Sequence, residues 1–318
     1  MADLPTCPVD DTAPPFTSTG VDYFGPFIIH ERRKNVKQYG VLFTCLASRA
    51  IHIEIAESLD TDSFLNALRR FVARRGNIRQ LYSDNGTNFV GAEKELKASL
   101  KEMNQGHIES QLRNIGMDWK FNPPLASNMG GAWERLIRTV RKVLSGLLQE
   151  HSNRLDRESF STLICEVEAI VNSRPLTCSS GDGCDLEPLT PNHILTGRTQ
   201  VTTPPPGIFD RDDLYVRRRW RRVQYLSNLF WSRWKNEFLL LQQRRQKWNQ
   251  PRRNMHVGDI VIMRDDNTPR NEWPLGIVKA VEPDSTGYIR VVTVKTQHSE
   301  YKRPINKLVL LVPNDNDN

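Results

Sequence analysis

The order of strand-like and helix-like segments in the first half of the chain constrains the fold most strongly. Three segments rich in β-branched and aromatic residues come first, at 19–29, 39–47 and 50–56, and are typical of a meander of strands. A helical pattern at 61–76 then leads to a short strand-like segment at 78–84. Because strands and helices that alternate in this way build α/β domains, we predict such a domain with a mixed sheet at its centre.

Four more segments complete the predicted domain. Helices are expected in roughly 90–103, at 130–150 and at 157–175, and a short strand at 116–124 that ends at two prolines. Apolar residues recur at helical spacing in the longer helical segments, as they do when one face is buried. In the helix that precedes these segments, Thr61 is expected to serve as the N-cap.

The remainder of the chain predicts a long helix and a small β domain. The stretch "TTPPPG" at 202–207 ends regular structure, and apolar residues from Val216 to Leu241 then recur about every 3.6 positions, which is typical of an amphipathic helix. Four short β-rich runs follow and indicate a small barrel. The predicted division is 1–15 as an irregular arm, 16–200 as the α/β core, 201–254 as a Pro-rich boundary with a basic helical segment, 255–312 as the barrel and 313–318 as a disordered tail.

Positive charge is concentrated in one part of the sequence. The segment from Arg211 to Arg253 holds thirteen Lys and Arg against three Asp and Glu, a net charge of +10, whereas the whole chain carries +7. The rest of the chain therefore sums to −3, and the segment predicts a polyanionic partner, most commonly nucleic acid. The residues expected on its exposed basic face are Arg217, Arg218, Arg221 and Arg222, and those expected in its core are Trp220, Trp231, Trp234 and Trp248.

The sequence argues against a membrane protein and against a secreted one. No apolar run approaches the ~18 residues needed to span a bilayer, and the N-terminus lacks the charged start and apolar stretch of a signal peptide. Five cysteines without framework spacing favour reduced thiols inside the cell. A zinc site from Cys178, Cys184 and His193 is disfavoured because the CxxC spacing is missing.

Three acidic residues stand out because of their positions in the predicted elements. Asp22 lies within the first strand, flanked by Val and aromatic residues, where an unpaired charge is costly to bury. Asp84 ends the fourth strand, and a pairing of that strand with the first would bring the two carboxylates together. Glu134 lies at the edge of the apolar stripe of the helix at 130–150. Carboxylates brought together in this way repel one another unless a cation lies between them.

Two of these residues also have a simpler interpretation. Asp84 begins an Asp-Asn-Gly stretch, which is common turn chemistry, and Glu134 could form an exposed pair with Arg138 worth only ~0.3–0.5 kcal/mol. Together, however, three carboxylates offer the hard oxygen ligands that suit Mg²⁺ or Mn²⁺. Two such ions ~3.5–4 Å apart can carry out phosphoryl transfer. Arg138, Arg141 and Lys142 on the outer side of the same helix would suit phosphate groups.

Several motifs resemble the integrase region of LTR retrotransposons of the BEL/Pao type. They are "GVDYFGPF", "SDNGTNFVG", "NPPLASNMGGAWERLIRTVRKVL" and "NSRPLT" in the core, and "LTPNHILTGR", "RRRWRRVQYLSNLFWSRWKNEFL", "QKWNQPRRN", "VGDIVIMRDDNTPRNEWPLG" and "RPINKLVLL" in the region that follows. The resemblance covers nearly the whole chain. It implies an RNase H-like catalytic core with a five-stranded mixed sheet flanked by helices, then a long basic helix and an SH3-like barrel.

The same resemblance implies a chemistry. The D,D-E triad of integrases would fall on Asp22, Asp84 and Glu134, with forty-nine residues between the last two. These residues would hold two Mg²⁺ or Mn²⁺ ions for DNA 3′-end processing and strand transfer. Asn88 and Asn128 would line the site; a His is expected at position 128 in this family, so tuning toward the substrate is expected to differ here.

Partners and alternatives follow from the resemblance as well. The expected partner is DNA, both element ends and target duplex, bound by a homo-oligomer that acts in the nucleus or first in a cytoplasmic particle. The His₂Cys₂ zinc module that usually precedes such a core is not found in the sequence, so joining of paired ends is expected to be poor. Two alternatives stay open, namely a catalytically silent or host-captured DNA-binding remnant and a ribonuclease on the same fold.

Overall fold

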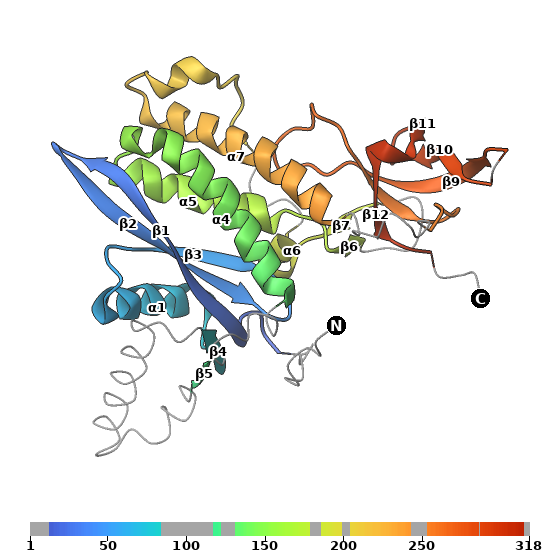
Figure 1. The fold of residues 1–318 in the computed structure, drawn as a ribbon. Coiled ribbons are helices and arrows are strands. Elements are labelled where there is room, and N and C mark those ends of the chain that lie inside the picture. The colour runs from blue at the N-terminus through green and yellow to red at the C-terminus, as the bar shows by residue number, and fades with distance from the viewer. Residues whose placement is uncertain are drawn as a thin grey trace. The chain divides into compact units, whose positions relative to one another are not determined.

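The chain folds into two compact units, each of which is described by itself (Figure 1). Unit 1 comprises Met1–Val171 and Gly207–Phe230, and unit 2 comprises Asn172–Pro206 and Trp231–Asn318. The computed structural model describes residues 13–83, 117–121, 131–178, 186–198, 204–242, 253–285 and 287–314, without the side chains of 118–121 and 131–135. Residues 172–206 group with the C-terminal part of the chain, and the five-part division of the sequence stays a prediction.

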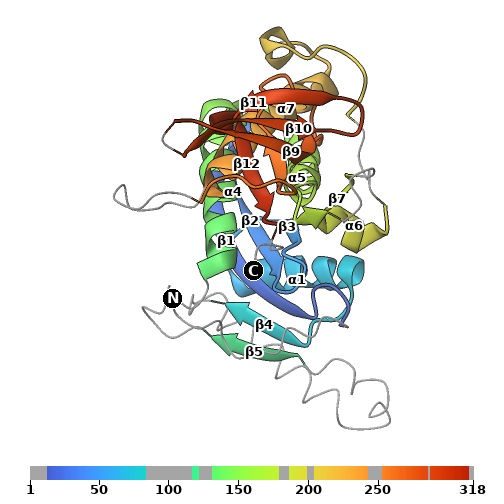
Figure 2. The ribbon, with the colours of Figure 1, turned by 90° about the vertical axis from the view of Figure 1, so that its right-hand side faces the viewer.

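A five-stranded mixed sheet forms the centre of unit 1 (Figure 2). Its strands are β1 (Ser18–Glu31), β2 (Lys34–Cys45), β3 (Ile51–Ala56), β4 (Gln80–Ser83) and β5 (Asp118–Phe121). The order across the sheet is β3-β2-β1-β4-β5. The meander β1–β2–β3 is antiparallel, whereas β4 runs parallel to β1 and β5 runs parallel to β4. The α/β class with a mixed five-stranded sheet is therefore confirmed.

Helices cover both faces of this sheet (Figures 1 and 2). Helix α1 (Thr61–Arg75) lies on one face, and α4 (Gly131–His151) and α5 (Arg157–Asn172) lie on the other. Burial on both sides explains why the second half of β2, from Gly40 to Cys45, is buried at every position instead of alternating. The helices expected at 61–76, 130–150 and 157–175 are confirmed, whereas the segment at 90–103 lies outside the described residues.

The cap of the first helix lies one residue before its predicted position. Asp60, not Thr61, is the N-cap, and its carboxylate accepts a hydrogen bond of 2.7 Å from the backbone N–H of Ser63. The prediction of Thr61 was wrong because both residues are good caps and only the backbone conformation decides between them. Asp60 is extended, whereas Thr61 is already helical.

Unit 2 contains a second five-stranded sheet, which is antiparallel throughout. Its strands are β8 (Ile260–Met263), β9 (Leu275–Pro283), β10 (Ile289–Lys295), β11 (Glu300–Pro304) and β12 (Leu308–Val312), in the order β11-β10-β9-β8-β12. Apolar side chains from four of these strands form one core, namely Val261, Val278, Ile289, Val292, Val294 and Leu308. The small all-β unit predicted at the C-terminal end is confirmed.

Shorter elements connect these parts. In unit 1 they are the 3-10 turns η2 (Ser152–Arg154) and η3 (Arg211–Leu214). Unit 2 adds the paired strands β6 (Thr177–Cys178) and β7 (Pro188–Leu189), helix α6 (Pro191–Thr196) and the 3-10 turn η4 (Ile305–Lys307).

The long helix α7 (Arg219–Gln242) confirms the apolar repeat in its middle but not at its ends. Val223, Phe230, Trp234 and Phe238 are buried, whereas Val216, Trp220 and Leu241 are 39%, 50% and 40% exposed. The sequence predicts a repeat that starts at Val216, but the helix begins three residues later. Among the helices in the described ranges, none is both long and apolar enough to cross a membrane.

Candidate functional site

The pairing of β1 with β4 is the feature that organises the candidate site. The two strands run parallel, with Ser18 opposite Gln80, Thr19 opposite Leu81 and Gly20 opposite Tyr82. The sequence prediction that Asp22 and Asp84 come together requires these two strands to be neighbours, and the observed pairing meets that requirement. Asp22 follows Gly20 by two residues in β1, and Asp84 follows Tyr82 by two residues in the sequence but lies outside the described residues.

Asp22 is held by an arginine from the helix that crosses its strand. Its carboxylate forms an ion pair with Nη2 of Arg141 in α4, and both side chains are about one third exposed, at 32% and 34%. The same Nη2 donates a hydrogen bond of 2.6 Å to the backbone carbonyl oxygen of Tyr23. The guanidinium therefore supplies a positive charge to Asp22, which lowers the cost of keeping that carboxylate half-buried.

Helix α4 presents one apolar face and one basic face. Ile137, Val140, Leu144 and Leu147 are buried, as the helical spacing predicts. On the outer face Arg138 and Lys142 are exposed, whereas Arg141 is half-buried because it turns toward Asp22. Glu134 belongs to the first turn of α4, but its side chain lies outside the described residues, as do Asn88 and Asn128.

The described residues do not contain a complete metal site. Within the described ranges, no group of three or more His, Cys, Asp and Glu side chains is arranged to hold a metal ion. Of the three predicted metal ligands, only Asp22 has a described side chain. Its half-exposed carboxylate is a hard oxygen donor and in that respect fits Mg²⁺ or Mn²⁺.

The four arginines predicted to bind DNA differ in their surroundings. Arg217 and Arg218 precede α7 and are exposed. Arg221 instead pairs with the buried carboxylate of Asp213 at 2.5 and 3.1 Å. Arg222 donates to three backbone carbonyl oxygens, those of Leu214 at 3.1 Å, Arg154 at 2.5 Å and Val216 at 3.1 Å. These two guanidiniums hold the turn before α7 in place.

The ion pair between Arg221 and Asp213 shifts the pKa values of both groups. The hydrogen bond from Arg221 lowers the pKa of Asp213, and the carboxylate raises the pKa of Arg221 in turn. Arg221 also lies over the rings of Phe209 and Trp220, with its guanidinium carbon 5.1 and 5.8 Å from their centroids. Of the four tryptophans expected in the core, Trp231 and Trp234 are buried, whereas the prediction for Trp220 is wrong because its side chain is half-exposed at the start of α7. Trp248 lies outside the described residues.

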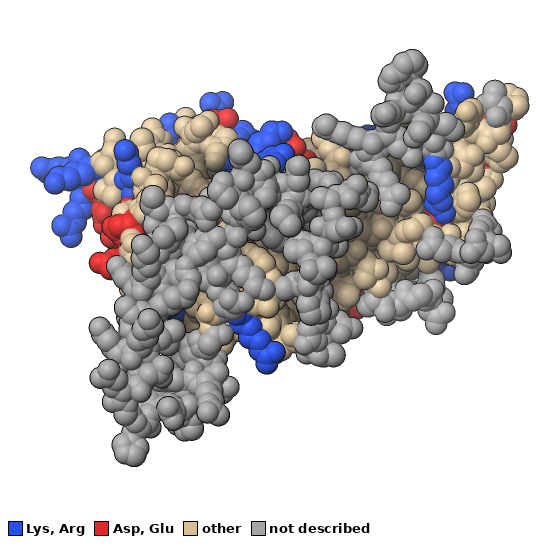
Figure 3. Space-filling view, turned by 60° about the horizontal axis from the view of Figure 1, so that its bottom comes forward, with Lys and Arg blue, Asp and Glu red and all other residues tan. Residues whose placement is uncertain are grey.

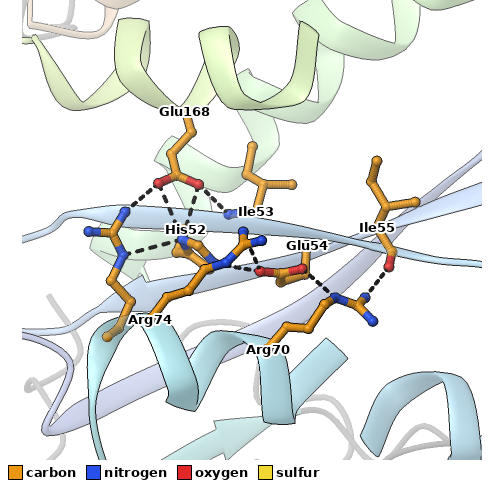
Figure 4. A network of polar contacts seen from close by, with 8 residues as sticks. His52, Ile53, Glu54, Ile55, Arg70, Arg74 and Glu168 are labelled. Atoms are coloured by element: carbon orange, nitrogen blue, oxygen red, sulfur yellow. Dashed lines mark hydrogen bonds and ion pairs between the residues drawn. The ribbon is translucent and has the colours of Figure 1, made fainter. Parts of the chain in front are cut away.

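A buried charged cluster was not predicted from the sequence (Figure 4). His52 on β3 contacts Glu168 of α5 through Nδ1 at 3.1 Å and Glu54 through Nε2 at 2.9 Å. Three arginines of α1 complete it: Arg75 reaches Glu168 at 2.6 Å, and Arg70 and Arg74 reach Glu54 at 2.8 and 3.1 Å. The cluster joins α1, the edge strand β3 and α5, so it stabilises the sheet with both of its helix layers.

The charges of this cluster support one another. Burial opposes the charge of His52, but its hydrogen bonds to Glu168 and Glu54 outweigh burial and raise its pKa. Burial likewise opposes ionisation of Glu54 and Glu168, yet the contacts to His52 and the arginines lower both pKa values. The only hint in the sequence was the His-Ile-Glu alternation at 52–54, which puts two polar side chains on one face of β3.

Comparisons with known proteins add little to this geometry. A family model described as "Family of unknown function (DUF5641)" matches residues 218–311, which is less than half of the chain. No curated protein matches the chain. A chain in the cryo-EM structure of the simian T-cell lymphotropic virus intasome in complex with PP2A regulatory subunit B56 gamma is 11% identical, with 94% of this chain and 80% of that chain covered and a TM-score of 0.40.

The magnesium complex of the HTLV-2 integrase catalytic core domain, in its trimeric form, is similar over a shorter region. It is 14% identical, with 57% of this chain and 97% of that chain covered and a TM-score of 0.36. At these identities and TM-scores neither likeness bears on the function of this chain.

Proposed function

We propose that the chain is an integrase of the BEL/Pao retrotransposon type, a D,D-E enzyme that processes DNA 3′ ends and joins them to a target duplex. The observation that supports this proposal is the parallel pairing of β1 with β4. Because of this pairing, β1, which carries Asp22, is the neighbour of β4, and Asp84 directly follows β4 in the sequence. The third carboxylate, Glu134, belongs to the helix whose Arg141 already contacts Asp22.

Asp22, Asp84 and Glu134 would together hold Mg²⁺ or Mn²⁺. When bound, such ions activate the attacking oxygen and stabilise the leaving oxygen of a phosphodiester. Asp22 supplies a carboxylate fixed on a central strand, and Arg141 reaches this carboxylate from α4. Arg138 and Lys142 on the exposed face of α4 would contact DNA phosphates beside the site, and the chain would act as a homo-oligomer assembled on DNA.

A single observation favours the alternative of a catalytically silent DNA-binding protein. A carboxylate that is already compensated by the guanidinium of Arg141 does not require a metal ion for its stability. The two functions differ in what they predict for purified protein, because only the enzyme converts DNA.

The deciding assay uses a branched DNA that already presents both reacting parts, because proximity is then supplied by the substrate. Full-length protein with Mn²⁺ or Mg²⁺ is expected to resolve the branch, and a duplex of RNA with DNA serves to test for ribonuclease activity. Asp22→Asn, Asp84→Asn and Glu134→Gln should each abolish resolution while duplex DNA is still bound. Resolution by Glu134→Gln at the wild-type rate, or binding of DNA without any conversion by wild type, would rule the proposal out.

A further inference from the structure

A basic cluster lies at the turn between β1 and β2. The two strands stay paired up to Glu31 opposite Lys34, and Arg32 closes the turn with a left-handed backbone, at a φ of 55°. The side chains of Arg32, Arg33, Lys34 and Lys37 are all exposed, and we call these four residues the ribbon tip. In Figure 3, Lys and Arg side chains project at the left-hand end, where Figure 1 places this turn.

The charge of the ribbon tip is not neutralised by its surroundings. Within the described part of the chain, none of its four cations forms an ion pair, and the nearest carboxylate along the ribbon is that of Glu31, opposite Lys34. Two acidic side chains at the start of the neighbouring helix α5, Asp156 and Glu158, are engaged by Arg219. The tip therefore keeps an excess of positive charge.

The ribbon that carries the tip is held in place by packing and hydrogen bonds. The backbone N–H of His30 donates to the carbonyl oxygen of Leu155 at 2.9 Å. Ile29 is fully buried, and the ring of Phe27 lies 5.9 Å from that of Phe160 in α5. Because the ribbon is fixed almost to its end, a partner bound at the tip would not have to order it first, which favours affinity.

We propose that the ribbon tip binds the phosphate backbone of duplex DNA, in addition to any contact made by the basic segment at 211–253. A two-stranded ribbon fits the major groove of B-DNA, which is about 12 Å wide, and cations at its end meet the phosphates that border the groove. Among the described large apolar residues of β1 and β2, only Ile28 is exposed. The ribbon therefore lacks the cluster of exposed apolar side chains that binding to a membrane surface requires.

The position of the tip relative to Asp22 gives the contact a definite reach. Both lie on one strand, and the ten residues from Asp22 to Arg32 span at most about 33 Å at ~3.3 Å per residue. One helical turn of B-DNA is about 34 Å long. The inference rests on the proposed function at this point, because it sets the tip up to one turn of duplex away from a phosphate that reacts at Asp22.

The test compares two pairs of arginine substitutions in the full chain. Arg32→Gln with Arg33→Gln removes two charges from the tip, and Arg69→Gln with Arg79→Gln removes two exposed charges elsewhere in unit 1. Affinity for a duplex of about three helical turns, ~30 base pairs, is measured by fluorescence anisotropy at several salt concentrations. The salt slope is expected to fall by roughly 0.9 for each phosphate that the protein no longer neutralises, so by 1 to 2 units for the tip variant and by less than half of that for the control.

Each outcome decides the inference. Equal slopes for wild type and tip variant, or an equal fall in both variants, would overturn it while leaving the proposed function intact. Failure of wild type to bind duplex DNA at any salt concentration would overturn both. If the tip variant melts below wild type, Lys34→Gln with Lys37→Gln repeats the test from positions on β2, outside the turn.

Discussion

Glu168 offers the most direct test of how the fold of unit 1 is held together. Its carboxylate accepts a hydrogen bond from Arg75 at 2.6 Å and from the backbone N–H of Ile53 at 2.9 Å, and it lies 3.1 Å from Nδ1 of His52. Glu168→Gln keeps the volume and removes the charge. The imidazolium of His52, only 4% exposed, then loses one of its two carboxylate partners.

The size of the effect follows from what remains. Removing one partner of a buried ion pair costs about 3–5 kcal/mol. Glu54 still contacts Nε2 of His52 at 2.9 Å, and Arg75 is 24% exposed, so its guanidinium can be hydrated instead. The loss of stability is therefore expected at the lower end, about 3 kcal/mol. At ~2–4 °C per kcal/mol for a unit of this size, the melting temperature should fall by roughly 6–12 °C.

The pH dependence of this loss of stability shows whether the charges of His52 and Glu168 cause it. The raised pKa of His52 means that its contribution is fully present below the ordinary value of 6.5 and is lost as pH rises through the folded value. The lowered pKa of Glu168 means that its contribution is present above 4.5 and is lost as pH falls through the folded value. The difference between wild type and Glu168→Gln should thus be largest between pH 4.5 and 6.5.

Differential scanning calorimetry from about pH 4 to about pH 9 would measure this difference, since that range includes the ordinary pKa values of both groups. Glu158→Gln is the matched control, because Glu158 is on the same helix and 83% exposed. Its substitution should change stability by less than about 0.5 kcal/mol. An equal effect of both substitutions, or a difference that does not vary with pH, would refute the role given to the cluster.

Three further substitutions test other contacts. Asp259→Asn should destabilise unit 2 by about 3–5 kcal/mol in a thermal melt, because the fully buried carboxylate pairs with Arg253 at 2.9 Å. Burial opposes the charge of Asp259, but its hydrogen bonds outweigh burial and lower its pKa. The stability of wild type should therefore fall as pH drops below 3.8, and the variant should lack this dependence. Gly40→Ala should lower stability by about 1–3 kcal/mol, since an added Cβ would lie 2.2 Å from the ring of Phe24. Arg141→Gln should increase Mn²⁺ affinity in calorimetric titration more than the exposed control Arg138→Gln does, because Arg141 competes for Asp22.

The sequence predicts those parts of the fold that depend on local patterns. The strands at 19–29 and 50–56 and the helices at 130–150 and 157–175 appear within three residues of their expected bounds, because the periodic burial of an element depends on neighbouring residues. The strand expected at 39–47 begins five residues earlier, at Lys34. The pairing of the first strand with the fourth, which the carboxylate hypothesis requires, is present. The N-cap was misplaced by one residue because two good capping residues are adjacent.

Contacts between distant residues could not be predicted in this way. His52 and Glu168 are 116 residues apart, and no local pattern marks them as partners. The charge count also did not reveal the four cations of the ribbon tip, because acidic residues elsewhere outside 211–253 bring the net charge of that part to −3. For the candidate site, the sequence named Asp22 and Arg141 separately, but it did not reveal that they pair. The roles of Asp84 and Glu134 stay predictions.

The basic segment before α7 shows why a charge pattern does not by itself define a binding surface. Arg217 and Arg218 are exposed, whereas Arg221 is engaged by Asp213 and Arg222 by three carbonyl oxygens. Arg217→Glu with Arg218→Glu should therefore weaken duplex DNA binding and flatten its salt dependence without lowering the melting temperature.

Arg221→Gln with Arg222→Gln should do the reverse, because Arg221 donates to the buried carboxylate of Asp213 and Arg222 donates to backbone carbonyl oxygens, and the variant loses these hydrogen bonds. Thermal melting of both variants and DNA titrations at several salt concentrations separate the two effects. If Arg221→Gln with Arg222→Gln melts like wild type and loses DNA affinity, these two arginines serve the DNA and not the turn. If Arg217→Glu with Arg218→Glu keeps the full salt slope, duplex DNA does not contact this part of the segment.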